Sequence, residues 1–90
     1  MTVSDDLIAS RLLELLSQRD PSASVCPSDV ARSLASSEPA WRALMPEVRR
    51  VASALAAAGV VQATQGDATI DLASAPAGPI RLRRGPAFRR

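Results

Sequence analysis

The residues with the clearest chemical capacity in this chain are its arginines. All eleven basic residues are Arg and none is Lys. A guanidinium group donates hydrogen bonds in a planar fork that fits phosphate oxygens or the edge of a guanine base. Residues 1–75 carry six arginines against nine acidic residues, a net charge of −3, whereas residues 76–90 carry five arginines and no acid, a net charge of +5. The pattern favours anion binding near the C-terminal end.

Both features of the arginines also have simpler explanations. Seventeen alanines accompany the eleven arginines, a mixture typical of codon bias in a GC-rich genome, and we favour codon bias as the reason for the absence of lysine. The C-terminal arginines are equally well explained as a solvated end that keeps the protein soluble.

Side chains for catalysis or metal binding are scarce. The chain has no His, no Tyr and one cysteine, Cys26, so it lacks the usual ligands of transition metals and the usual acid–base groups near neutral pH. Helix capping explains the pair Asp5 and Asp6, and the other carboxylates show no pairing by spacing. Glycine-rich phosphate loops, CxxC and HExxH motifs are absent. We therefore expect no enzyme, no cofactor and no metal site.

Length and hydropathy predict one domain that does not enter a membrane. Ninety residues with 47% hydrophobic content suit a single compact core. One cysteine cannot form an intrachain disulfide, and no signal-peptide pattern is present. The uncharged stretch at residues 51–65 contains polar residues and is too short in its apolar part to span a bilayer. We expect a cytoplasmic protein.

Two helices are predicted in the first third of the chain. The first covers residues 4–19, with Ser4 as its N-cap and with acids in its first turn, where the helix dipole favours them. Its apolar face consists of Ile8, Leu12, Leu15 and Leu16. The second opens at Pro27 with Cys26 in the cap position. Residues 23–25 before it form a short strand, which we expect to pair with a later hairpin.

The third helix follows a break. The sequence Ser36-Ser37-Glu38-Pro39 restarts a helical turn through Trp41, and we expect Pro46 to open the main helix, which Gly59 ends. Its inward stripe consists of Val48, Val51, Ala52 and Leu55. We interpret Trp41 as a core residue, with base stacking as the alternative.

A hairpin and a last strand follow. Residues 60–65 and 68–72 are joined by Gly66-Asp67, a two-residue loop with Gly first, as a type II′ turn prefers. Alternation places these side chains outside: Gln62, Thr64, Thr69 and Asp71. Residues 79–83 alternate again as a last strand. We place the domain at residues 1–83 and a basic, flexible tail at 84–90.

The order of elements predicts a mainly α fold with a small antiparallel β-sheet, a winged helix-turn-helix with a three-helix core and a wing. The segments CPSDVAR, WRALMPEVRR, VVQATQG and GPIRLR resemble a family of small bacterial proteins described only as a domain of unknown function and assigned a winged-helix fold. The resemblance covers about residues 8–83 and implies no established activity. Its members often have a basic wing turn, whereas this chain has Asp67 there.

Two functions fit this fold, because winged helices serve both as DNA readers and as protein-contact modules. For double-stranded DNA, we expect groove contacts from Arg49, Arg50 and Ser53, and phosphate contacts from Arg32, Arg42, Arg81, Arg83 and Arg84. The acidic body and the acidic wing oppose that interpretation. The alternative is a homodimer or a complex with another protein, made by the outer face of the third helix or by a sheet edge.

Overall fold

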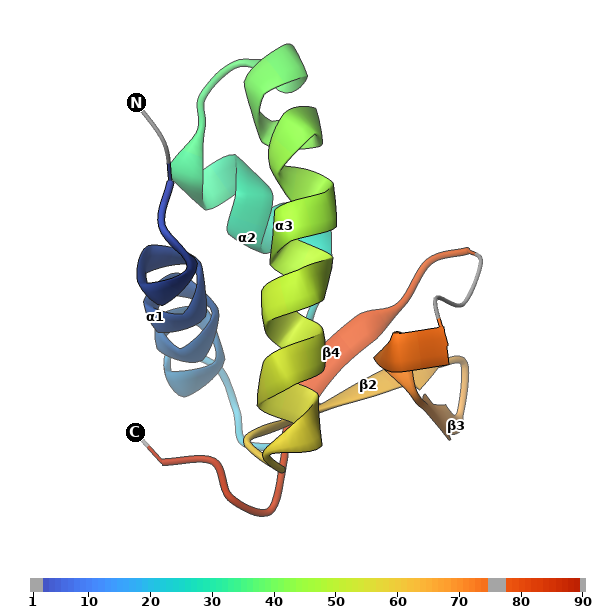
Figure 1. Cartoon of the computed structure of the whole chain (residues 1–90). Coiled ribbons are helices and arrows are strands. Elements are labelled where there is room, and N and C mark those ends of the chain that lie inside the picture. The colour runs from blue at the N-terminus through green and yellow to red at the C-terminus, as the bar shows by residue number, and fades with distance from the viewer. Residues whose placement is uncertain (1–2, 75–77, 90) are drawn as a thin grey trace.

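The computed structural model describes residues 3–74 and 78–89. The elements, in chain order, are α1 (Asp5–Ser17), β1 (Ser24–Val25), α2 (Pro27–Leu34), α3 (Glu38–Ala57), β2 (Val61–Gln65), β3 (Ala68–Ile70), the 3₁₀ turn η1 (Leu72–Ser74) and β4 (Arg81–Arg84). Figure 1 shows α3 at the centre, with α1 and α2 on one side and the β2–β3 hairpin projecting on the other. This arrangement confirms the predicted fold class, mainly α with a small antiparallel sheet, and is consistent with a winged helix.

Both of the first two helices begin where the sequence predicts. The Ser4 hydroxyl accepts a hydrogen bond from the Leu7 amide at 3.1 Å, so Ser4 is the N-cap of α1. Cys26 precedes α2, and its amide donates to the Asp29 carboxylate at 3.0 Å. That reciprocal contact from the third residue of a helix fixes the direction in which the chain enters it.

The third helix differs from the prediction, because α3 is continuous and contains Pro46 in its interior. Ser37 caps it by accepting from the Ala40 amide at 3.3 Å. A proline inside a helix removes the bond to the carbonyl four residues earlier, here that of Arg42. Both Arg42 and Pro46 lie on the exposed side of the helix, where water can satisfy that carbonyl. The expected helix start at Pro46 is therefore wrong.

The sheet has the order β1-β4-β2-β3, with antiparallel pairing throughout. The predicted strand at β1 exists, but its neighbour is β4 and not the hairpin, because β4 lies between them. Gly66 has φ +61°, as the first position of a type II′ turn requires. Thr64 is only 8% exposed, contrary to the predicted alternation; it lies opposite Arg81 in the β2–β4 register.

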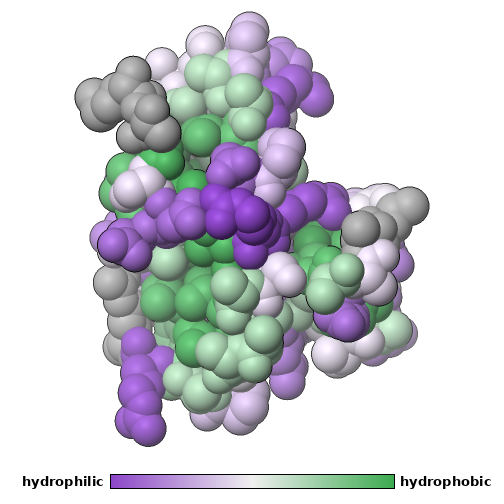
Figure 2. Space-filling view, in the orientation of Figure 1, coloured by the Kyte–Doolittle hydropathy of each residue, from purple (hydrophilic) through white to green (hydrophobic). Residues whose placement is uncertain are grey.

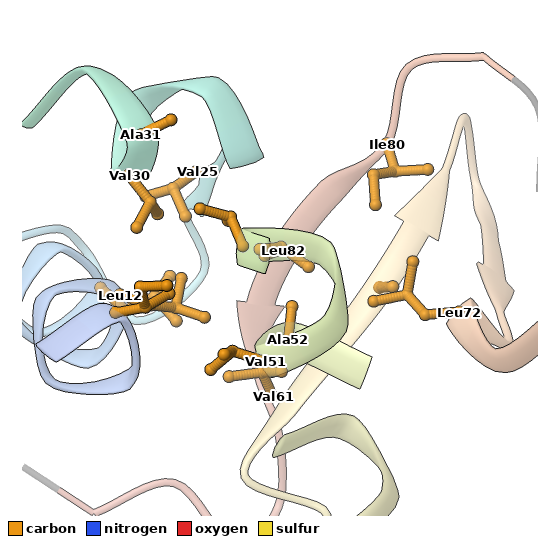
Figure 3. Close-up of a cluster of buried hydrophobic side chains, with 14 residues drawn as sticks. Leu12, Val25, Val30, Ala31, Val51, Ala52, Val61, Leu72, Ile80 and Leu82 are labelled. Atoms are coloured by element: carbon orange, nitrogen blue, oxygen red, sulfur yellow. The ribbon is translucent and has the colours of Figure 1, made fainter. Parts of the chain in front are cut away.

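The core lies between the helices and the inner face of the sheet. Figure 3 shows side chains from all three helices meeting those of the strands. Leu82 from β4 is fully buried, as are Leu12 from α1 and Val30 from α2. Because successive residues of a strand alternate between faces, burial of Leu82 turns Arg81 and Arg83 away from the helices.

The domain extends beyond the predicted boundary at residue 83. Strand β4 includes Arg84, the Gly85 amide donates to the Val60 carbonyl, and the Ala87 amide donates to the Gly59 carbonyl, both at 2.9 Å. Phe88 packs against the core cluster. In Figure 1 this segment passes beneath the end of α3 toward α1. The described residues after Arg83 are therefore part of the domain, because their backbone groups find partners at the end of α3.

Candidate nucleic-acid interface

The predicted contact residues lie in three places. Arg49, Arg50 and Ser53 lie on α3 and line one groove. Arg32 and Arg42 lie around Trp41, near the start of α3. The remaining three, Arg81, Arg83 and Arg84, belong to β4. The structure therefore does not join the eight residues into one surface.

Arg50 is held by two carboxylates. Its Nη2 lies 2.6 Å from Asp5 Oδ1 and 2.6 Å from Glu47 Oε2, and its Nη1 lies 2.9 Å from Asp5 Oδ2. The fork-shaped contact with Asp5 is the geometry that guanidinium and carboxylate groups favour. Hydrogen bonds from Arg50 lower the pKa of Asp5, and the two acids raise the pKa of Arg50. The charge of Arg50 is thus compensated within the protein.

Beside this network, a groove separates α3 from the hairpin side of the molecule. It has a volume of about 530 Å³ and continues into a second hollow of about 430 Å³, and Ser53 and Ala57 line both. Arg49 reaches across it, with Nη2 3.4 Å from the Gly78 carbonyl oxygen. Figure 2 shows a hydrophilic band across the middle of this face and a wider apolar area below it. The groove is therefore mainly apolar, with a polar rim.

Trp41 stacks with two arginines. The guanidinium carbon of Arg32 lies 4.5 Å from the ring centroid and that of Arg42 lies 4.9 Å from it. Trp41 is half-buried against the core, as predicted. Arg42 also forms an ion pair with Glu38 at 2.8 Å. The indole ring is therefore a poor candidate for stacking on a base, since two arginines already lie over it.

Arg81 and Arg83 are exposed on the outer face of the sheet and contact no carboxylate among the described residues. Arg81 donates to the hydroxyl of Ser24 at 2.9 Å and to its carbonyl at 3.1 Å. Arg83 donates to the carbonyl of Ser22 at 2.7 Å. These neutral acceptors fix the guanidinium groups but leave their charge uncancelled.

A comparison with protein families covers most of the chain. A model of the DUF3253 family, described as proteins of unknown function, matches residues 5–85. The chain belongs to this family. The matched region of the DUF3253 domain includes all of β4, and with it Arg84 and Gly85. No match is found among curated proteins.

Arg84 of the DUF3253 domain has a structural place. Its side chain points to the helix side of the sheet, where Nη2 donates to the carbonyls of Leu16 at 3.0 Å and Arg19 at 3.1 Å. These carbonyls lie at the C-terminal end of α1, which a positive charge stabilises. Phe88 stacks on its guanidinium at 4.6 Å. Arg84 therefore joins β4 to α1 and is not available on the outer face.

Sequence reasoning missed the residues that position the arginines. Ser22 lies 61 residues before Arg83, and Ser24 lies 57 residues before Arg81. The signal that was present is the alternation of Arg81 and Arg83, which places both on one face with Gln62 once β2 and β4 are paired. Among the described residues no group of three potential ligands is placed to hold a metal, and no described helix is long and apolar enough to cross a membrane.

Proposed function

We propose that this domain binds double-stranded DNA through its phosphate backbone. The observation that carries the proposal is the contrast in how the arginines are paired. The arginine-to-carboxylate pairs of the described residues involve Arg11, Arg42 and Arg50, on the helical side of the molecule. The arginines of β4 have carbonyl and hydroxyl acceptors instead, so this part of the domain keeps a positive charge.

Several features support nucleic acid as the partner. Arginine contacts phosphate in a bidentate geometry, and backbone contacts supply most of the sequence-independent affinity of DNA-binding proteins. The winged-helix arrangement, with a helix and a hairpin beside each other, is common among DNA-binding proteins. We propose that the protein acts in the cytoplasm, where it would have access to DNA.

Binding to a labelled mixed-sequence duplex, measured by fluorescence anisotropy at several salt concentrations, tests this proposal. We expect affinity to fall steeply with salt, with a log–log slope of about −0.9 for each phosphate neutralised. A chain that shows no binding at low salt, under conditions where it is folded by circular dichroism, does not have this function.

A second candidate function is self-association through the groove beside α3. On that face Arg49 and Arg50 are balanced by Asp5 and Glu47, so the net charge is zero and two copies meet without repulsion. The apolar lining, including Ala54, supports contact with an apolar surface.

Sedimentation equilibrium distinguishes this second candidate. Ala57→Glu places a charge in both hollows and should convert a dimer to a monomer. Ala43→Glu is the matched control, because Ala43 is exposed on α3 but lines neither hollow. A wild-type chain that is monomeric at high concentration excludes the second candidate.

A further inference from the structure

We infer that the outer face of the sheet, carried by Arg81 and Arg83, is the phosphate-contact surface for a nucleic-acid duplex, and that α3 does not enter a groove. This inference rests on the proposed function and gives it a location and a mode. It differs from the mode expected of a winged-helix DNA reader, in which the third helix enters the major groove.

The register of the sheet brings polar donors together around these two arginines. The exposed Gln62 lies opposite Arg83. Thr64 lies opposite Arg81 but is only 8% exposed, and the exposed Thr69 follows it across the next pairing. Directly paired residues of antiparallel strands point to the same face. The outer face therefore carries two cations about 7 Å apart along the strand, next to amide and hydroxyl groups of the kind that bind phosphate and sugar oxygens.

The two guanidinium groups are oriented before any ligand arrives. Arg81 is held by Ser24 of β1, and Arg83 is held by Ser22 in the loop before β1. Arg81 uses Nε and Nη2 in these bonds, and Arg83 uses Nη1. The Nη1 group of Arg81 and the Nη2 group of Arg83 have no partner among the described residues and remain to donate to an anion. Fixing a flexible side chain in advance reduces the entropy that binding costs.

The acidic groups of the sheet lie away from this pair. Asp67 is in the turn at the end of the hairpin and Asp71 follows β3, which is the edge strand farthest from β1. Asp20 lies nearer and keeps its negative charge, because its Oδ1 accepts from the neutral amide and hydroxyl of Ser22 at 2.9 and 2.7 Å. The Ser22 hydrogen bonds lower the pKa of Asp20, and the cation that adds to this effect is Arg84 of the inner side. A phosphate backbone that approaches at the β1–β4 edge therefore avoids the acidic wing. Contact through the wing itself would bring phosphate close to Asp67 and Asp71.

The ligand is a duplex and not a single strand, because the face has no aromatic side chain. The sequence contains one Trp, one Phe and no Tyr. Trp41 belongs to α3, and Phe88 lies under Arg84 on the inner side. Sequence-tolerant binding of single strands depends on stacking of bases on aromatic rings. With only cations and small polar groups, the face fits a backbone whose bases stay paired, and binding should not depend on sequence.

A comparison of two double variants tests this inference. Arg81→Gln with Arg83→Gln removes two charges from the outer face. Arg32→Gln with Arg49→Gln removes two charges from the helical side, and neither of those arginines is paired with a carboxylate among the described residues. Salt-dependent anisotropy with a labelled mixed-sequence DNA duplex is measured for both variants and the wild type. We expect the outer-face variant to lose about 1.8 from the log–log slope and the control to lose little.

The other outcomes each decide a point. Wild-type binding that is lost equally in both variants, or more in the control, overturns the location while leaving the proposed function intact. No wild-type binding overturns both. Tighter binding of the single strand than of the duplex overturns the duplex assignment, as does equal competition by polyglutamate at the same charge. Arg81→Lys with Arg83→Lys is the control that keeps both charges. It should retain the wild-type slope, so a loss of slope in the glutamine variant then reflects lost charge and not misfolding.

Discussion

The α3 face and the outer face of the sheet each present two arginines from a single element, yet they differ in electrostatic character. On α3, Arg50 is paired with Asp5 and Glu47, and these two acids also balance the charge of Arg49, which has only a carbonyl acceptor. On β4, Arg81 and Arg83 are held by serine carbonyl and hydroxyl groups. A carboxylate cancels the charge of the guanidinium it binds, whereas a carbonyl only orients it. The number of arginines on an element therefore does not indicate where a protein is positive; the acceptors do.

An arginine that changes the local charge need not change the stability of the fold. The side chains of Arg50 and Asp5 are 55% and 57% exposed, and ion pairs this exposed contribute little to the free energy of folding. Their main effect is on the local field. Arg84, one residue beyond Arg83, has the opposite balance, because its half-buried side chain joins two elements of the fold.

The outer face of the sheet can form only if the end of β4 is held in place. Of the substitutions considered, Gly85→Ala should lower the stability of this region most. A Cβ atom at Gly85 would overlap the carbonyl oxygen of Gly59 and lie 2.9 Å from its carbonyl carbon. Backbone atoms cannot rotate away as a side chain can, so we expect a loss of about 3 kcal/mol in the free energy of unfolding. Urea denaturation of the variant measures this loss.

Pro86→Ala is the control for that substitution, because Pro86 is exposed and should change stability by less than about 0.5 kcal/mol. If Gly85→Ala is as stable as the control, the contact between the C-terminal segment and the end of α3 is not as described.

Two neighbouring arginines of β4 provide the next test. Arg84→Gln should lower the free energy of unfolding by about 2 kcal/mol, since it removes charged hydrogen bonds to the carbonyls that end α1. Arg83→Gln should cost much less, because Arg83 is exposed on the other face. For DNA affinity the order of the two variants should be reversed. Arg83→Gln should weaken binding, because Arg83 lies on the proposed contact face, whereas Arg84→Gln should not. Equal losses of stability in the two variants would contradict the assignment of the two faces.

Much of this fold was predictable from local patterns. Ser4 as a cap, the glycine turn at Gly66 and the alternation around Leu82 each depend on neighbours within a few residues, and the structure confirms all three. The α3 start was not predictable in this way. A proline is compatible both with the first turn and with an exposed interior position of a helix, and only the cap at Ser37 distinguishes them.

The candidate site was harder to predict, because it depends on distant pairs. The contact between Arg50 and Asp5 joins residues 45 apart in the sequence, and no local pattern indicates it. The short strand β1 was predicted, but its partner was not, since pairing depends on where the last strand inserts. The residue types suggested anion binding, whereas tertiary contacts decide which arginines are available for it.

Removing the two acids that pair with Arg50, Asp5 of α1 and Glu47 of α3, should abolish the difference between the faces. Asp5→Asn with Glu47→Gln leaves Arg50 without a carboxylate partner, so the helical side becomes net positive. We expect the salt dependence of duplex binding to become steeper by about 0.9 for each additional phosphate contacted. The same two substitutions combined with Arg50→Gln should restore the wild-type slope. An unchanged slope in the first variant would show that the charge of Arg50 is not what keeps α3 from DNA, and that the helix is sterically unable to approach it.

The smallest expected effect is on how the stability of the fold changes at acidic pH, the acid limb of its pH dependence. The hydrogen bonds from Arg50 lower the pKa of Asp5 below its ordinary value of 3.8, so the folded state binds a proton at this site less readily than the unfolded state. The stabilisation is present above about pH 4 and is lost as pH falls through the lowered pKa. Thermal unfolding followed by circular dichroism between neutral and strongly acidic pH should show a shallower loss of stability for Asp5→Asn than for the wild type. Asp6→Asn, in the same helical turn, leaves the Arg50 contact intact and should keep the steeper acid limb; a wild-type acid limb in Asp5→Asn would mean that the pair is not formed in solution.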